Sequence, residues 1–90
     1  MALTPKGRQV LKARAHALKP IVLIGNNGLT DAVLKEIDRA LHDHELIKVR
    51  IAGNDRNARL EAFAAICEQT KAEIVQNIGN IGVLYRPTKD

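Results

Sequence analysis

The sequence predicts an α/β fold in the order α-β-α-β-α-β-β, with a mixed four-stranded sheet and helices on at least one of its faces. Three segments carry apolar residues at intervals of three and four, the spacing of an amphipathic helix. Four shorter runs rich in Ile, Val and Leu predict strands. Gly79-Asn80 joins the last two runs so closely that they must form an antiparallel hairpin. The 90 residues are sufficient for one domain over 1–90, and 46% of them are hydrophobic.

The first helix is expected to begin at Thr4-Pro5, because Thr is a favourable N-cap and Pro fits the first helical position. Its apolar stripe comprises Val10, Leu11, Ala13, Ala17 and Leu18. Pro20 ends this helix and can occupy the first position of a strand. The apolar run over residues 20–24 is therefore predicted to be a buried strand.

The stretch Gly25-Asn26-Asn27-Gly28 links this strand to the second helix. Glycine permits left-handed backbone and close approach of a ligand, and a helix start presents unpaired N–H groups with a partial positive charge. A strand, a loop with Gly at both ends and a helix can thus bind a phosphate. An ordinary turn is the alternative, because Gly and Asn are common in turns.

The second helix is expected to be capped near Thr30 and to bury an apolar stripe. The stripe comprises Val33, Leu34, Ile37, Ala40 and Leu41. Residues 46–52 form the clearest strand, because apolar residues alternate with Lys48 and Arg50. These two cations then share one sheet face, which is either merely exposed or a basic binding surface.

The third helix is expected over residues 56–69, after a Gly-Asn-Asp turn whose Asp55 is the cap. Its apolar stripe comprises Leu60, Phe63, Ala64, Ile66 and Cys67. Strands follow over residues 73–78 and 81–86. Residues 79–82 repeat the Gly-x-x-Gly pattern, but they lie between two strands with no helix start behind them, so we predict a hairpin turn there.

The charge distribution suits an anionic partner, with a net charge of +4 and a sequence pI of about 9.6. The five cations of residues 1–28 meet no carboxylate, whereas residues 29–90 hold nine Lys and Arg against ten Asp and Glu. The sequence therefore places the basic excess beside the glycine loop, unless these cations form only a solvated helix face. The only aromatic residues, Phe63 and Tyr85, offer few stacking platforms for unpaired bases.

Membrane and disulfide-bonded classes are disfavoured. Cys67 is the only cysteine, so an intramolecular disulfide is excluded and a reducing compartment is expected. No apolar run approaches the roughly 18 residues of a transmembrane helix, and the start of the chain lacks the apolar stretch of a signal peptide. We therefore expect a soluble cytoplasmic protein without a membrane partner.

Neither metal binding nor catalysis is predicted. The cluster His42-Asp43-His44-Glu45 is rich in metal-ligand types, but its two His are two residues apart and point to different sides of a helix. Cys67 lies on an apolar stripe, and the chain has no nucleophile elbow or Walker-type Gly-Lys-Ser/Thr motif. We expect no enzyme activity, no cofactor, no bound metal and no catalytic residue.

Three stretches carry a resemblance to a known family and occur in the same order as in that family. They are residues 18–30 (LKPIVLIGNNGLT), 44–50 (HELIKVR) and 83–87 (VLYRP). Together they resemble the CRM domain, the chloroplast RNA splicing and ribosome maturation domain, in its stand-alone bacterial YhbY-type form. The resemblance implies a fold similar to the C-terminal domain of translation initiation factor three. It also implies that the Gly-x-x-Gly loop is comparable to that of KH domains, which clamp a nucleic-acid backbone.

The resemblance also implies a role in RNA maturation, because bacterial members associate with precursors of the large ribosomal subunit and plant relatives help group II introns to splice. The sequence departs from the family at two places. Many relatives have a basic residue in the loop where Asn26 and Asn27 stand, which shifts the charge to nearby Lys and Arg. Gly82 replaces a larger apolar residue, a change expected to affect the hairpin.

We therefore hypothesise a monomeric RNA-binding protein that associates with large-subunit ribosomal RNA precursor in the pre-ribosomal particle and acts in ribosome assembly. The predicted RNA-binding residues are Gly25, Asn26, Asn27 and Gly28, with Lys12, Arg14, Lys19, Lys48, Arg50 and Arg86 around them. Backbone contacts of this kind give affinity with little reading of sequence. The alternatives are a module whose basic helix docks an acidic protein partner on the ribosome, an enzyme acting on RNA, and a DNA-binding protein.

Overall fold

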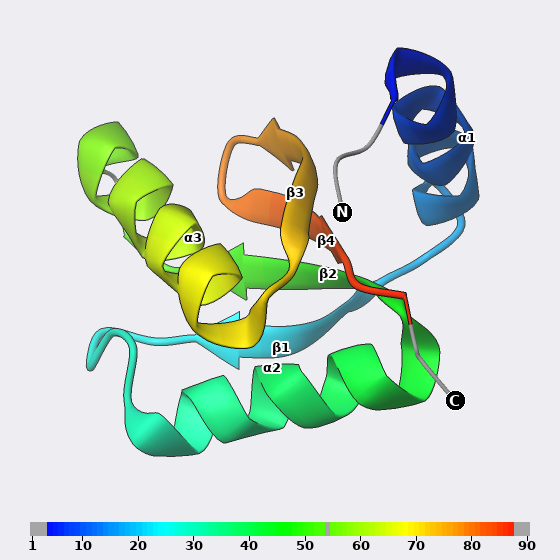
Figure 1. The fold of residues 1–90 in the computed structure, drawn as a ribbon. Coiled ribbons are helices and arrows are strands. Elements are labelled where there is room, and N and C mark those ends of the chain that lie inside the picture. The colour runs from blue at the N-terminus through cyan, green and yellow to red at the C-terminus, as the bar shows by residue number, and fades with distance from the viewer. Residues whose placement is uncertain (1–3, 54, 88–90) are drawn as a thin grey trace.

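Seven elements follow in the predicted order in the computed structural model, which describes residues 4–53 and 55–87 (Figure 1). They are α1 (Pro5–Ala15), β1 (Pro20–Ile24), α2 (Asp31–His44), β2 (Leu46–Ile51), α3 (Arg56–Thr70), β3 (Glu73–Ile78) and β4 (Ile81–Tyr85). The strands form one sheet in the order β1-β2-β4-β3, with β1 and β2 parallel and the other pairs antiparallel. The predicted mixed sheet is confirmed. No helix within the described ranges is long and apolar enough to cross a membrane.

All three helices begin where the sequence predicts, because a side-chain oxygen accepts a backbone N–H of the first turn in each. The bonds run from Gly7 N–H to Thr4 Oγ1 (3.0 Å), from Val33 N–H to Thr30 Oγ1 (3.2 Å) and from Ala58 N–H to Asp55 Oδ1 (3.2 Å). The middle residue of the predicted turn before α3, Asn54, lies outside the described residues.

The sheet separates two apolar clusters. α2 and α3 cover one face, and the larger cluster there is built around buried residues such as Ile37, Phe63 and Leu84. α1 packs on the opposite face above the smaller cluster. That cluster comprises Leu11, Ala15, Leu46, Val75 and Val83. In Figure 1, α1 accordingly stands apart from the layer that α2 and α3 form.

The predicted apolar stripe of the first helix is wrong in most of its members. α1 ends at Ala15, and only Leu11 and Ala15 are buried, whereas Val10 is 55% exposed. Ala17 and Leu18 lie beyond the helix in a turn that the bond from Leu18 N–H to Ala15 O (2.9 Å) closes. The reason is geometric: a helix that rests on a sheet along one narrow line buries residues four apart.

The strand over residues 20–24 is half exposed, not buried as predicted. Val22 and Ile24 point into the larger cluster, but Ile21 is 49% and Leu23 is 65% exposed. β1 is an edge strand that pairs only with β2, and α1 packs against β2 and β3 instead of reaching across it. One face of β1 therefore stays open to solvent.

The hairpin at Gly79-Asn80 is confirmed, with Gly79 in the left-handed region at φ 56°. Gly82 sits within β4 opposite Val49, directly under the ring of Phe63. A Cβ added at Gly82 would lie 2.7 Å from Phe63 Cζ and 2.8 Å from its Cδ1. Gly82 therefore serves packing, because the Phe63 ring occupies the space that a side chain at position 82 would fill.

Candidate nucleic-acid interface

The Gly25–Gly28 loop is a tight exposed turn between β1 and α2. Gly28 N–H donates to Gly25 O at 3.1 Å, which leaves Asn26 and Asn27 exposed at the tip. Gly28 has φ +73°, where a glycine is strongly favoured. Gly25 has no such requirement, and a Cβ added there would meet nothing within 4 Å. The fold thus does not demand a glycine at position 25, and the space in front of it is open.

The loop presents backbone donors. Among the described residues, no backbone acceptor engages the N–H groups of Asn26 or Asn27. α2 begins at Asp31, so its partial positive charge lies directly behind the turn. The Asp31 carboxylate in the first turn offsets part of that charge. The arrangement suits one phosphate approached by backbone N–H groups, with further charge supplied from elsewhere.

Two other turns meet the loop at the same end of the sheet. Because β1 and β2 are parallel they end together, and Ala52 N–H donates to Ile24 O (2.9 Å). The hairpin turn joins them through Ile51 N–H to Asn80 O (2.9 Å). Arg59 then ties the turns to each other, donating from Nε to Gly79 O (3.2 Å) and from Nη1 to Gly53 O (3.0 Å).

Sequence reasoning missed two arginines at this end of the molecule. Arg59 is engaged with the carbonyls of the two turns, whereas Arg56 is exposed in the first turn of α3. The available signal was their place in the chain: they come directly after the strand that pairs in parallel with β1. A parallel pair ends on one edge, so the residues after one strand lie near the residues after the other.

Five of the six predicted cations share the sheet face that carries α1. Arg50 projects from β2 between Leu23 of β1 and Ile81 of β4. Two residues earlier on the same face, Lys48 donates from Nζ to Leu18 O at 3.0 Å. Lys48 also lines two surface hollows. Lys12 lines one of them, and Arg14 and Lys19 line the other.

These cations form a strip across the sheet and do not surround the loop as the sequence suggested. α1 packs over Leu46 and Tyr85 near the start of β2, whereas the loop follows the far end of β1. Figure 1 shows the blue α1 and the cyan loop at opposite sides of the view. Lys19 and Gly25 flank β1, so roughly 20 Å of extended chain separates them. The cations lie away from the loop because α1 packs on β2 and β3 and not on β1. The closeness of α1 and the loop in the sequence does not reveal this packing.

Arg86 lies apart from this strip because its guanidinium is used inside the fold. Its Nη1 contacts Asp38 Oδ1 (2.6 Å) and Thr70 O (2.7 Å), and its Nη2 donates to Asp38 O (3.0 Å). These bonds tie the end of β4 to α2 and α3 in the opposite layer. We therefore do not group Arg86 with the cations of the open sheet face.

The two layers of the molecule differ in charge. Residues 5–24 hold five Lys and Arg, β2 holds two more, and neither segment contains a carboxylate. α2 on the opposite face has four carboxylates against two Lys and Arg. The open side of the sheet is therefore a cationic surface, which attracts anions over a distance of about a Debye length.

The structure offers little support for metal or thiol chemistry. Within residues 4–53 and 55–87, no group of three or more His, Cys, Asp or Glu is placed to hold a metal ion. Cys67 packs against the larger apolar cluster. Burial, with a smaller contribution from Glu73, raises the pKa of the Cys67 thiol, so the thiolate that a nucleophile needs is disfavoured.

Comparison with known proteins places these features in context. The family model described as the CRS1/YhbY (CRM) domain matches residues 3–86. A Haemophilus influenzae protein named RNA-binding protein is 52% identical over 98% of this chain and 89% of its own length. A Pseudomonas aeruginosa protein named as a probable RNA-binding protein is 43% identical over 96% of this chain and 83% of its own length.

A solved structure has the same fold. The solution structure of a hypothetical Staphylococcus aureus protein, described as a candidate RNA-binding protein, superposes with a TM-score of 0.86. It is 37% identical in sequence and covers 99% of this chain and 93% of that one. The predicted element order and mixed sheet are therefore shared with an experimentally determined relative.

Proposed function

Because the chain belongs to the CRS1/YhbY (CRM) domain family, whose matched bacterial relatives are stand-alone proteins named for RNA binding, we propose that it binds RNA. The Gly25–Gly28 loop binds a phosphate through backbone N–H groups. Lys12, Arg14, Lys19, Lys48 and Arg50, here called the cationic strip, hold the neighbouring backbone. The protein has no catalytic role in this proposal.

The observation that carries the proposal is the cationic strip itself. Its five Lys and Arg come from two segments that contain no carboxylate, residues 5–24 and β2. The strip continues towards a loop that presents backbone N–H groups. Contacts to phosphates supply affinity with little reading of sequence. The near absence of aromatic residues favours structured RNA, recognised by shape and backbone, over a stacked single strand.

We further propose that the RNA is large-subunit ribosomal RNA precursor and that the protein acts in the cytoplasm during ribosome assembly. This part rests on the family resemblance. Crosslinking the protein to RNA in growing cells and sequencing the attached fragments tests it. We expect enrichment of large-subunit precursor RNA; recovery of other RNA classes without it would contradict the ribosomal role.

Salt dependence tests the cationic strip directly. We expect the logarithm of the association constant for a structured RNA to fall linearly with log salt, by about 0.7–0.9 for each phosphate neutralised. Arg50 is exposed on the open sheet face, so Arg50→Gln is expected to remove about one phosphate contact. The slope should then become shallower by about 0.7–0.9. The matched change Arg39→Gln on α2 leaves the slope unchanged. If Arg50→Gln leaves the slope unchanged, Arg50 does not contact the RNA.

A further inference from the structure

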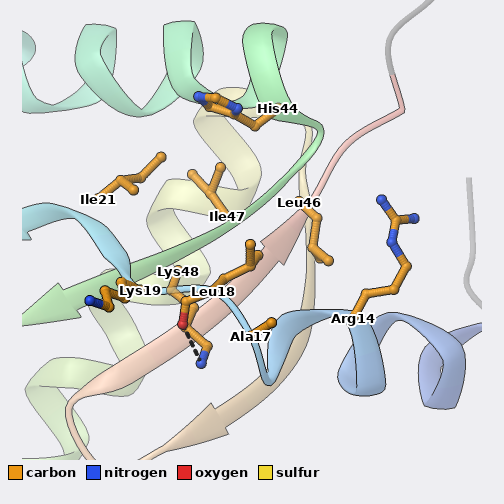
Figure 2. Close-up of a pocket in the computed structure, with 9 residues that line it drawn as sticks. All are labelled: Arg14, Ala17, Leu18, Lys19, Ile21, His44, Leu46, Ile47 and Lys48. Carbon is orange, nitrogen blue, oxygen red and sulfur yellow. Dashed lines mark hydrogen bonds between the residues drawn. The ribbon is translucent and has the colours of Figure 1, made fainter.

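A pocket of about 350 Å3 opens at the end of the cationic strip farthest from the loop (Figure 2). The chain leaves α1 at Ala15 and crosses over β2 to reach the start of β1. The bond from Lys48 Nζ to Leu18 O (3.0 Å) fixes this crossing segment over β2. His44, at the end of α2, lies on the opposite side of the opening in Figure 2.

The pocket combines an apolar interior with a cationic rim. Its uncharged lining is mainly apolar and comprises Ala17, Leu18, Ile21, Leu46 and the strand at Ile47, whose own side chain is buried in the larger cluster. Its charged lining residues are Arg14, Lys19 and Lys48, and no carboxylate belongs to the lining that the described residues provide. The volume lies within the roughly 300–1,000 Å3 of sites for small organic groups. An occupant that suits this lining is mainly apolar and is attached to negative charge.

We propose that the pocket receives the base of one unpaired nucleotide of the bound RNA, with the adjoining phosphates held by Arg14 and Lys19; this rests on the RNA binding proposed above. Ile21 is 49% and Leu18 is 36% exposed in the free protein, so a base between them removes apolar surface from water. Arg14 can also stack its planar guanidinium on the base. Lys48 Nζ keeps two donors free of Leu18 O for acceptors on the base edge.

The position of the pocket connects it to the rest of the interface. Lys48 lines both this pocket and the neighbouring hollow that contains Lys12, and Arg50 follows it on the same face of β2. An RNA backbone that runs from the loop along the cationic strip therefore remains close to positively charged side chains until it reaches the pocket. The rest of the interface recognises the shape and backbone of the RNA. The inserted base would fix the position of the protein along that RNA.

The test compares two hairpin RNAs of equal length, one fully paired in its stem and one with a single-nucleotide bulge of 2-aminopurine. We expect the native protein to bind the bulged RNA at least about fivefold more tightly, because the bulged base leaves water for an apolar pocket, and to change the 2-aminopurine fluorescence. Ala17→Leu fills the pocket without altering charge and is expected to abolish both differences while leaving the affinity for the paired RNA unchanged. Ala13→Leu, at an exposed position of α1 outside the pocket, is the matched control.

Other outcomes have distinct meanings. Equal affinity of the native protein for both RNAs, or equal weakening of both by Ala17→Leu, would overturn the base pocket and leave RNA binding intact. Binding of neither RNA would instead contradict the proposed function. Ile21→Thr, on the solvent side of an edge strand, provides a second variant if Ala17→Leu does not fold, and it carries the same expected loss of preference for the bulge.

Discussion

Aspartate at positions 26 and 27 is expected to weaken binding to structured RNA by about 100-fold or more. Each loop N–H that donates to a phosphate is a charge-assisted bond of about 1.5–3 kcal/mol, and 1.4 kcal/mol corresponds to a factor of ten. The two carboxylates add repulsion at the same place. Asp is as compatible with the turn as Asn, so the fold is retained. Fluorescence anisotropy with a labelled RNA at fixed salt measures the loss.

The matched control adds one negative charge far from the loop. Asn26→Asp is compared with Gln69→Glu, which lies near the end of α3 and away from the three turns. We expect Gln69→Glu to bind almost as the native protein does. Native-like binding by the Asn26→Asp, Asn27→Asp double variant would contradict the phosphate-binding loop. It would favour the alternative in which the basic helix docks an acidic protein partner.

Gly25→Ala separates the steric role of the loop from its charge. Position 25 is not in the left-handed region and has open space around it, so alanine there is expected to leave stability unchanged or raise it by about 0.4–1 kcal/mol. RNA affinity is nevertheless expected to fall, because the added methyl group stands where the RNA backbone approaches. Loss of affinity together with loss of stability would indicate a structural effect only.

Gly82→Ala is expected to lower the free energy of unfolding by about 1–3 kcal/mol, the usual cost of overpacking a core. The new methyl group would press on the Phe63 ring, which is only 3% exposed. For a domain of this size the midpoint of thermal unfolding falls by roughly 4–8 °C for each kcal/mol. Urea titration and thermal melts monitored by circular dichroism measure both quantities.

A double-mutant cycle with Phe63→Leu identifies the cause. The smaller side chain makes room for a methyl group at position 82, so the double variant is expected to be more stable than the sum of the single changes predicts. Contacting residues typically couple by about 0.5–3 kcal/mol. Additive effects would show that Phe63 is not the residue that requires glycine at position 82.

Local chemistry made most of the fold predictable. The caps at Thr4, Thr30 and Asp55 and the turn at Gly79-Asn80 act within four residues, and the structure contains all of them where the sequence places them. The alternation around Lys48 likewise identifies the two faces of β2. Such features depend on neighbouring residues alone, so a single sequence is sufficient to find them.

Features that depend on distant residues were not predictable in this way. The run from Pro20 to Ile24 is apolar throughout, so its periodicity cannot distinguish a buried strand from an edge strand with one open face. Arg86 was assigned to the RNA surface, but its partner Asp38 is 48 residues away in the chain. No local pattern reports where α1 docks, which is why the cationic strip was expected around the loop.

The docking of α1 also makes the order of synthesis matter. α1 is near the start of the chain, yet two of the residues beneath it, Val75 and Val83, belong to the last two strands. As the chain is made from its N-terminus, Leu11 and Ala15 have no complete surface to pack on until β3 and β4 have been produced. A nascent chain can carry all the cations of residues 5–19 and still lack their arrangement. The surface proposed to bind RNA is therefore assembled only after β3 and β4 have been synthesised.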